Sequence, residues 1–457
     1  MLESDFWKDW TRAMAEIVIR GATLVTEGLP QSDISIENGR IQAIGPDLPG
    51  ATEEIDARGL HIFPGIIDVH LHFNEPGRTE WEGAATGSRA FAAGGGTLYF
   101  DMPLNSTPCT INAREFDRKC DALSAASITD FALWGGLVPG NLPEMAELAA
   151  RGVVGFKAFM CDSGLPEFPR ADDLTLLEGL REAARLGLPV AVHAESQEVT
   201  QALRHRMLEE NRSGIRAFLD SRPILAETEA IQRATWLAGQ AKAKLHIVHV
   251  SSGRGVVVAA EARARGVDVS IETCPHYLYF TEEDLERLGA IAKCAPPLRE
   301  KCEQNSLWTQ LLAGTIDIVG SDHSPSPPEM KSGDFDHAWG GIAGVQSTLA
   351  VLLDRGHHAR GLPLERISEL LAGHPASRFR IANKGRLVPG ADADLAIVDV
   401  SKSFELHAED LMQRHRLSPY IGARFRGAVE RTIRRGETIF NQGKITARNP
   451  GMLVRPA

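Results

Sequence analysis

Hydrophobic and polar positions follow two different patterns along the 457 residues of the chain. Residues 15–59 consist of short stretches that alternate apolar with polar residues or run through β-branched ones, and Asn38-Gly39 between two of them favours a hairpin turn. From about residue 61 to residue 380, short apolar runs alternate with longer amphipathic stretches. After about residue 381 the chain returns to the pattern of residues 15–59. The pattern therefore predicts β-strands with tight turns at both ends of the chain and an α/β region between them.

The middle region contains eight short apolar runs that predict buried β-strands. They span residues 63–72, 95–103, 129–137, 153–160, 188–195, 243–251, 267–277 and 316–325. Helix-like stretches such as 174–186 and 227–241 lie between them. Near-continuous apolar strands that alternate with helices are typical of a parallel sheet, and eight such units predict a (β/α)8 TIM barrel.

The fold class is therefore α/β, with a barrel and a small second domain. We expect the (β/α)8 barrel to occupy residues 61–380. Residues 15–60 and 381–457 are predicted to form one small flanking β-sandwich together. Residues 1–14 form a short polar and aromatic extension, which is either a tail or a segment before a true start at Met14.

Composition and charge narrow the classes of partner. The net charge of -11 is spread along the chain, which argues against a nucleic acid or an anionic membrane surface as partner. No apolar run approaches the ~18 residues of a membrane span, and the first residues lack the pattern of a secretory signal. The six cysteines show no C-x-x-C spacing and are expected to be reduced thiols of a cytoplasmic protein.

Polar side chains occur near the carboxyl ends of five of the eight predicted strands. In a parallel barrel these ends converge on one mouth, where barrel enzymes carry out their chemistry. The side chains in question are His70, His72, Lys157, His193, His249 and Asp322. The sequence therefore predicts that residues far apart along the chain meet at one site.

Two of these histidines lie on the same strand face. His70 and His72 are two residues apart, and side chains with that spacing point the same way from a strand. Imidazole and carboxylate ligands suit zinc and similar divalent ions. One metal ion would need His70, His72 and Asp322, and a second would take His193 and His249.

A two-metal site also needs an anion between the metals. Carboxylation of the Lys157 side chain by CO2 would provide one and would remove the problem of a buried ammonium group. Two metals ~3.5–4 Å apart can lower the pKa of a shared water and polarise a carbonyl group. Asp322 would then act as general base toward the water and as general acid toward the leaving nitrogen.

Each signal taken alone has a structural explanation. His249 could be a hydrogen-bonded core residue, Lys157 could form a salt bridge inside the barrel, and the segment around Asp322 could be a turn or a helix cap. Four histidines, one lysine and one aspartate at strand ends in barrel order favour a shared catalytic site over these separate explanations.

Several stretches carry a family resemblance. They include "DVHLHFNEPGRTEWEG", "DMPLNSTP", "GVVGFKAFM", "ETCPHYLYF" and "SDHSPSPPEMK". The chain from about residue 15 to residue 440 resembles the cyclic amidohydrolases of the amidohydrolase superfamily, which comprise dihydroorotases, hydantoinases (dihydropyrimidinases) and allantoinases. The similarity is greatest to allantoinases. The resemblance implies two metal ions, usually zinc, held by the six residues above with Lys157 carboxylated, and commonly a homotetramer.

The substrate class depends on residues beside the metal ligands. Dihydroorotases typically carry an arginine two residues after the second histidine, where it binds a substrate carboxylate, and this chain has Asn74 there. The segment Met102-Pro103-Leu104-Asn105 also has the form found in allantoinases. A neutral ring therefore fits better, with Asn74 and Ser324 as hydrogen-bond partners or, equally, as turn residues.

The resemblance implies hydrolysis of the cyclic amide of allantoin to allantoate in purine catabolism. The near alternative is a hydantoinase or dihydropyrimidinase that acts on other neutral cyclic amides. A third alternative is a non-catalytic assembly protein with the same barrel, but such proteins have lost metal ligands and this chain has all six.

Overall fold

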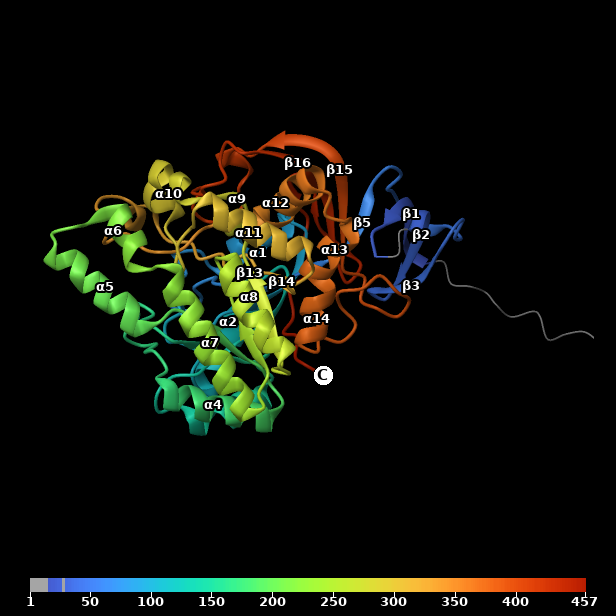
Figure 1. The fold of residues 1–457 in the computed structure, drawn as a ribbon. Coiled ribbons are helices and arrows are strands. Elements are labelled where there is room, and N and C mark those ends of the chain that lie inside the picture. Colours follow the sequence, from blue (N-terminus) through green and yellow to red (C-terminus); the bar gives the residue numbers. More distant parts are fainter. Residues whose placement is uncertain (1–14, 27–28) are drawn as a thin grey trace, which may run out of the picture.

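The computed structural model describes residues 15–26 and 29–457. It consists of a closed barrel surrounded by helices, with a sheet built from both ends of the chain beside it (Figure 1). The predicted extension at residues 1–14 lies outside the described residues.

Short parallel strands occupy all eight predicted strand positions. They are β6 (Ile66–Leu71), β7 (Gly96–Asp101), β8 (Asp130–Leu133) with its continuation β9 (Gly135–Gly136), β10 (Phe156–Phe159), β11 (Val190–His193), β12 (Leu245–Ile247), β13 (Val269–Thr273) and β14 (Ile318–Val319). Strands β9 to β14 form one run of neighbours and β6 to β8 another. Trp134 separates β8 from β9, so the third position joins the two runs.

The barrel closes between its first strand and the chain that follows its last one. Leu71 pairs in parallel with His323, and the Asp322 amide donates to the His70 carbonyl over 2.9 Å. This closure confirms the predicted TIM barrel. It also places His70 and Asp322 side by side although they are 252 positions apart in the chain.

Helices cover the outside of the barrel (Figure 1). They are α1 (Ala84–Ala93), α2 (Ala113–Ala126), α3 (Met145–Arg151), α4 (Asp173–Leu186), α5 (Gln197–Glu209), α6 (Gly214–Ser221), α7 (Ile224–Ala241), α8 (Gly253–Ala264), α9 (Pro275–Tyr279), α10 (Glu282–Leu288), α11 (Lys301–Leu312), α12 (Thr348–Val351), α13 (Leu364–Ser368) and α14 (His374–Arg378). Local signals set their ends. The Asp172 side chain accepts from the Thr175 amide at the start of α4, and Gly187 ends that helix in the left-handed conformation.

The two ends of the chain share one nine-stranded sheet. Its strands are β1 (Ala15–Leu24), β2 (Leu29–Glu37), β3 (Arg40–Gly45), β4 (Ala51–Asp56), β5 (His61–Pro64), β15 (Leu395–Glu405), β16 (Arg424–Arg434), β17 (Glu437–Asn441) and β18 (Lys444–Ile445). Strand β5 pairs with both β1 and β15 and so joins the two ends. The predicted division after residue 60 therefore falls just before a strand of this sheet.

The hairpin predicted at Asn38-Gly39 is confirmed. Glu37 pairs with Arg40, and the two turn residues have φ of 51° and 72°. Positive φ at both central residues is the requirement of a type I′ turn, which explains the Asn-Gly sequence.

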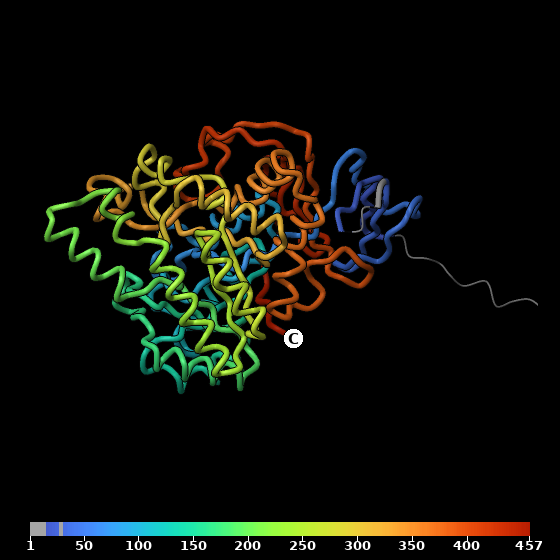
Figure 2. The backbone as a smooth tube through the Cα atoms, viewed as in Figure 1, coloured from blue at the N-terminus to red at the C-terminus, as the bar shows by residue number. Residues whose placement is uncertain are grey.

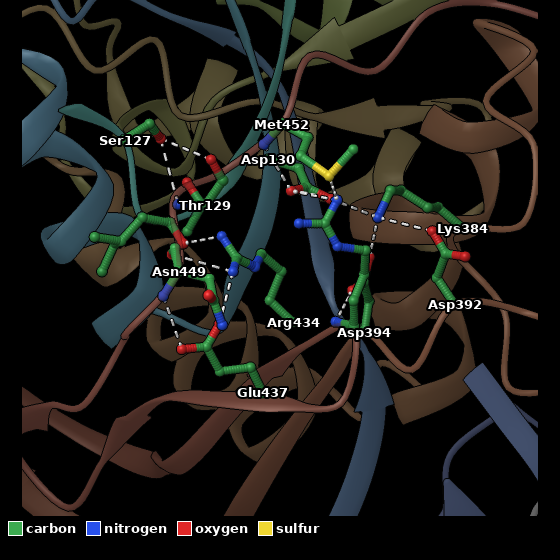
Figure 3. Close-up of polar contacts among 12 residues, drawn as sticks. Ser127, Thr129, Asp130, Lys384, Asp392, Asp394, Arg434, Glu437, Asn449 and Met452 are labelled. Carbon is green, nitrogen blue, oxygen red and sulfur yellow. Dashed lines mark hydrogen bonds and ion pairs between the residues drawn. The ribbon is translucent and has the colours of Figure 1, made fainter. Parts of the chain in front are cut away.

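A buried charge cluster fixes the end sheet to the barrel (Figure 3). The Lys384 ammonium lies 3.0 Å from Asp130 at the start of β8, 3.2 Å from Asp392 and 2.5 Å from Asp394. Burial alone would lower the pKa of Lys384, but these carboxylates raise it well above its usual range. Asp130 also accepts from the Met452 amide over 3.1 Å, so the cluster holds the C-terminal tail as well.

The C-terminal tail pairs with β8. Figure 2 shows where the chain ends, and there the Ala457 amide donates to the Arg380 carbonyl, just after α14, over 2.9 Å. The Phe131 amide donates to the Met452 carbonyl over 3.0 Å, and the Val454 amide donates to the Phe131 carbonyl over 2.7 Å. No helix within residues 15–26 and 29–457 combines the length and apolar character needed to cross a membrane.

Candidate active site

The structure brings the predicted histidines together at the carboxyl ends of the barrel strands. The ring centroids of His70 and His72 are 5.7 Å apart, those of His70 and His249 5.3 Å, and those of His193 and His249 4.7 Å. All four side chains are buried. They come from the ends of β6, β11 and β12, so the parallel barrel is what makes them neighbours.

Asp322 completes one half of this cluster. Its Oδ1 lies 3.2 Å from Nε2 of His70 and 3.5 Å from Nε2 of His72. Burial alone would raise the pKa of Asp322, but the adjacent His70 and His72 rings lower it well below its usual range. Two imidazole nitrogens and a carboxylate oxygen that converge on one point match the donor set of a divalent metal such as zinc.

His193 and His249 form the other half. Nδ1 of His193 lies 3.0 Å from Nε2 of His249. The His193 ring also stacks on Phe159, with centroids 4.5 Å apart and an interplanar angle of 11°. Packing against this aromatic ring fixes the orientation of the imidazole, so two nitrogen atoms are presented at one place.

Lys157 is buried beside both halves. Its side-chain nitrogen finds no hydrogen-bond partner among the described residues and lies 4.9 Å from the centre of the Phe159 ring. Burial lowers the pKa of Lys157 to about 8. Burial also lowers the pKa of His193 and His249, and the Lys157 charge adds to both shifts. An uncompensated ammonium group among candidate metal ligands is unfavourable, so the pocket would suit an anionic form of this side chain.

Two buried carboxylates that the sequence reasoning missed contact the imidazole nitrogens of His70 and His193. Oε1 of Glu272 lies 2.8 Å from Nδ1 of His70, and Oε2 of Glu195 lies 2.9 Å from Nε2 of His193. Burial alone would raise the pKa of each carboxyl. His70 lowers the pKa of Glu272 to about 2, and the ion pair with Arg222 does the same for Glu195. Such carboxylate–histidine pairs fix the tautomer and orientation of a metal ligand.

One further group of potential ligands lies beside the site. Ligand atoms of Cys161, His193 and Glu195 fall within 4.8 Å of one another. The Glu195 carboxylate is neutralised by Arg222, and burial raises the pKa of the Cys161 thiol to about 12. A neutral thiol and a paired carboxylate indicate that this group orients His193.

The two predicted substrate contacts, Asn74 and Ser324, are both buried. Nδ2 of Asn74 donates to the Pro325 carbonyl over 3.2 Å, while its Oδ1 finds no partner among the described residues. Oγ of Ser324 accepts from Nδ2 of Asn105 over 3.3 Å. Asn74 has φ of 61°, so it also has the turn role that the sequence left open, with its Oδ1 still available as an acceptor.

Comparisons with known proteins identify the family of the chain. Residues 61–439 match the profile of the amidohydrolase family. The chain therefore belongs to the amidohydrolase family. Within that family it is similar to proteins named allantoinase: 64% identity to one from Solibacter usitatus, covering 97% of each chain, and 57% to one from Rubrobacter xylanophilus, covering 96% of this chain and 98% of the relative.

Solved structures give the same fold. The L-hydantoinase (dihydropyrimidinase) from Arthrobacter aurescens superposes with a TM-score of 0.94 at 34% identity, covering 97% of this chain and all of the other. A dihydropyrimidinase from Brevibacillus agri superposes with a TM-score of 0.89 at 29% identity, covering 96% of this chain and 98% of the other. The predicted family and fold class are thus confirmed.

Proposed function

We propose that this protein is an allantoinase, which hydrolyses the cyclic amide bond of allantoin to give allantoate. The observation that carries the proposal is the 64% identity, over 97% of both chains, to a protein named allantoinase. The cluster of buried histidines and lysine, with the partly buried Asp322, supplies the chemistry that such a hydrolysis needs.

The residues of the cluster fit two divalent metal ions, for which zinc is the best match to the donor set. His70, His72 and Asp322 would hold one ion, and His193 with His249 the other. A carboxylated Lys157 would lie between them. This modification would account for a buried side-chain nitrogen that has no hydrogen-bond partner among the described residues. When bound, the two ions would supply Lewis acidity that lowers the pKa of water and polarises the substrate carbonyl.

Asp322 is the candidate for proton transfer. Because the His70 and His72 rings keep its pKa low, Asp322 is ionised and can accept a proton from the attacking water. The same carboxyl can then deliver that proton to the ring nitrogen that leaves. Glu272 and Glu195 keep the His70 and His193 rings in a fixed orientation throughout.

A neutral ring fits the position of Asn74. A substrate carboxylate would lack a cationic partner at that position and would lose ~1.5–3 kcal/mol. The free Oδ1 of Asn74 can accept a hydrogen bond from a ring N–H, and Ser324 is the second candidate contact. The alternative is a hydantoinase or dihydropyrimidinase, which the structural similarity to the Arthrobacter aurescens protein favours.

The decisive experiment measures ring opening by zinc- or manganese-loaded protein on allantoin, hydantoin, dihydrouracil and dihydroorotate side by side. We expect fast turnover of allantoin alone. Preference for hydantoin or dihydrouracil would show that allantoin is not the substrate, but it would still agree with the proposed metal-dependent hydrolysis. Asp322→Ala should abolish turnover while the protein stays folded, and unchanged turnover of that variant would overturn the role of the site.

The proposal also covers the cellular location and the oligomeric state of the enzyme. A cytoplasmic location agrees with six cysteines that form no disulfide. The homotetramer rests on the family resemblance, and size-exclusion chromatography with light scattering would test it.

A further inference from the structure

A cavity of about 360 Å³ lies among helices on the outside of the barrel. Its lining residues come from the end of α9, helix α10, the first turn of α11, the helical segment η5 (Leu352–His358) and Arg360 just after that segment. Figure 1 shows α9, α10 and α11 in the same part of the fold. None of the six predicted metal ligands lines the cavity. Its volume suits a small organic molecule of a few heavy atoms.

The cavity is cationic in a protein that is acidic overall. Four basic side chains line it, Arg287, Lys301, Arg355 and Arg360, against one carboxylate, Asp284. The whole chain has 49 basic and 60 acidic residues, so the cavity has the opposite sign of charge from the protein as a whole. Cationic clefts with low-dielectric walls raise the local concentration of anions.

Two of the four cations are already compensated. Arg287 donates to Asp284 over 2.8 Å, and Nε of Arg355 lies 3.2 Å from Asp354. Lys301 and Arg360 have neutral partners instead: Lys301 donates to Oε1 of the Gln304 side chain, and Arg360 donates to the Arg355 carbonyl over 2.7 Å. Within the described residues the cavity therefore keeps two uncompensated positive charges.

The guanidinium groups are held in place before any ligand binds. The Arg355 guanidinium lies 4.7 Å from the centre of the Tyr279 ring and donates to its hydroxyl over 3.2 Å. The Arg360 guanidinium lies 4.4 Å from the centre of the Trp308 ring. Burial and the neighbouring Arg355 charge lower the pKa of Arg360, so a bound anion would relieve an existing repulsion. Groups fixed by stacking lose little further entropy on binding.

We propose that this cavity is a binding site for a small organic dianion, either a phosphate monoester or a dicarboxylate. The two uncompensated cations, Lys301 and Arg360, match two negative charges, and the fixed guanidinium edges match the paired oxygens of a carboxylate or a phosphate. The site is separate from the proposed metal centre, so binding does not depend on ring opening.

The test is isothermal titration calorimetry of the full-length, metal-loaded protein with malonate, glycerol 3-phosphate and acetate. We expect at least one of the two dianions to bind roughly tenfold or more tightly than acetate, because the second charge adds a charge-assisted contact. Which dianion binds more tightly identifies the chemical source. Equal binding of acetate and both dianions would overturn the proposal.

Matched variants separate this cavity from the metal centre, which also attracts anions. Lys301→Gln with Arg360→Gln should weaken dianion binding roughly tenfold or more. The control, Arg181→Gln with Arg265→Gln, removes the same charge from exposed positions and should leave binding unchanged. Asp322→Ala should also leave it unchanged. Dianion binding that survives loss of Lys301 and Arg360, or that disappears in Asp322→Ala, would place the anion elsewhere and refute the site.

Discussion

Nδ1 of His193 lies 3.0 Å from Nε2 of His249, while the opposite nitrogen of the His193 ring lies 2.9 Å from the Glu195 carboxylate. A carboxylate can only accept, so the proton of a neutral His193 is on Nε2. Nδ1 then presents a lone pair toward His249. This tautomer is the one a metal ligand requires, and Glu195 enforces it.

Glu195→Gln should therefore weaken the metal held by His193 and His249. Glutamine keeps the size of the side chain but loses the charge that pairs with His193 and Arg222. We expect metal affinity at this half of the site to fall about 10–100-fold, as when other partners of ligating histidines are removed. Chelator competition followed by elemental analysis measures the change. Glu198→Gln, at an exposed position, is the control, and wild-type affinity in Glu195→Gln would contradict the role.

Lys157→Ala should lose both metal and activity if a carboxylated lysine bridges the two ions. Alanine leaves a space into which a short carboxylic acid can bind, so propionate or acetate should restore part of the turnover. Lys157→Met fills that space and is the matched control that should not be rescued. Full metal content in Lys157→Ala, with no rescue, would show that no carboxylated side chain is needed.

The sequence predicted the barrel and the convergence of its ligands because both depend on periodic patterns. Eight apolar runs and an H-x-H pair are visible in one dimension. Glu272 was missed because a carboxylate within an apolar strand carries no signal that tells which ring it faces. Glu195 did leave a signal, since it lies two residues after His193 and so on the same side of an extended segment.

Other features arise only from packing between distant segments. No pattern in the last eight residues predicts that they run alongside β8, because that pairing is made through backbone groups such as those of Met452 and Val454. The Lys384 cluster joins residues from three separate parts of the chain for the same reason. The assignment of β5 to the end sheet likewise depends on its neighbours β1 and β15.

Substitution of Asn74 can separate its backbone role from its side-chain role. With φ of 61°, the position favours asparagine or glycine, and alanine there should cost about 1–2 kcal/mol of stability. Asn74→Gly should keep the backbone and lose the side-chain contacts. We expect Asn74→Gly to fold normally but to raise KM for allantoin roughly fivefold or more, the effect of one lost hydrogen bond. Steady-state kinetics and urea unfolding of both variants test this, and an unchanged KM in Asn74→Gly would remove Asn74 from the substrate contacts.

Glu82 should make stability depend on pH. Its side chain is fully buried, with Oε1 accepting from the Arg414 amide over 2.9 Å and Oε2 facing Nε2 of His323 at 3.9 Å. Burial raises the pKa of Glu82 from 4.5 to about 7. Between these two values the folded protein holds a proton that the unfolded chain has released. The free energy of unfolding therefore falls as pH rises through this range, by up to roughly 3 kcal/mol from this residue.

Glu82→Gln mimics the protonated form and should remove that dependence. The difference in unfolding free energy between Glu82→Gln and the wild type should be small near pH 4.5 and should grow to its maximum above pH 7. Urea unfolding of both metal-free proteins across this range measures it, since other titrating groups cancel in the difference. A difference that does not vary with pH would show that Glu82 is ionised in the fold throughout.

Lys384→Met should destabilise the protein strongly, because it leaves Asp394 buried without a counter-charge and leaves Asp130 with Arg435 alone (Figure 3). Breaking a buried ion pair on one side typically costs about 3–5 kcal/mol. Lys402→Met, which removes an exposed contact with Glu430, should cost about 1 kcal/mol or less and is the control. Adding Asp394→Asn to Lys384→Met should recover part of the loss, since it removes one of the stranded charges. Urea unfolding of the four proteins measures these differences, and a loss in Lys384→Met no larger than in Lys402→Met would show that the cluster does not hold the end sheet to the barrel.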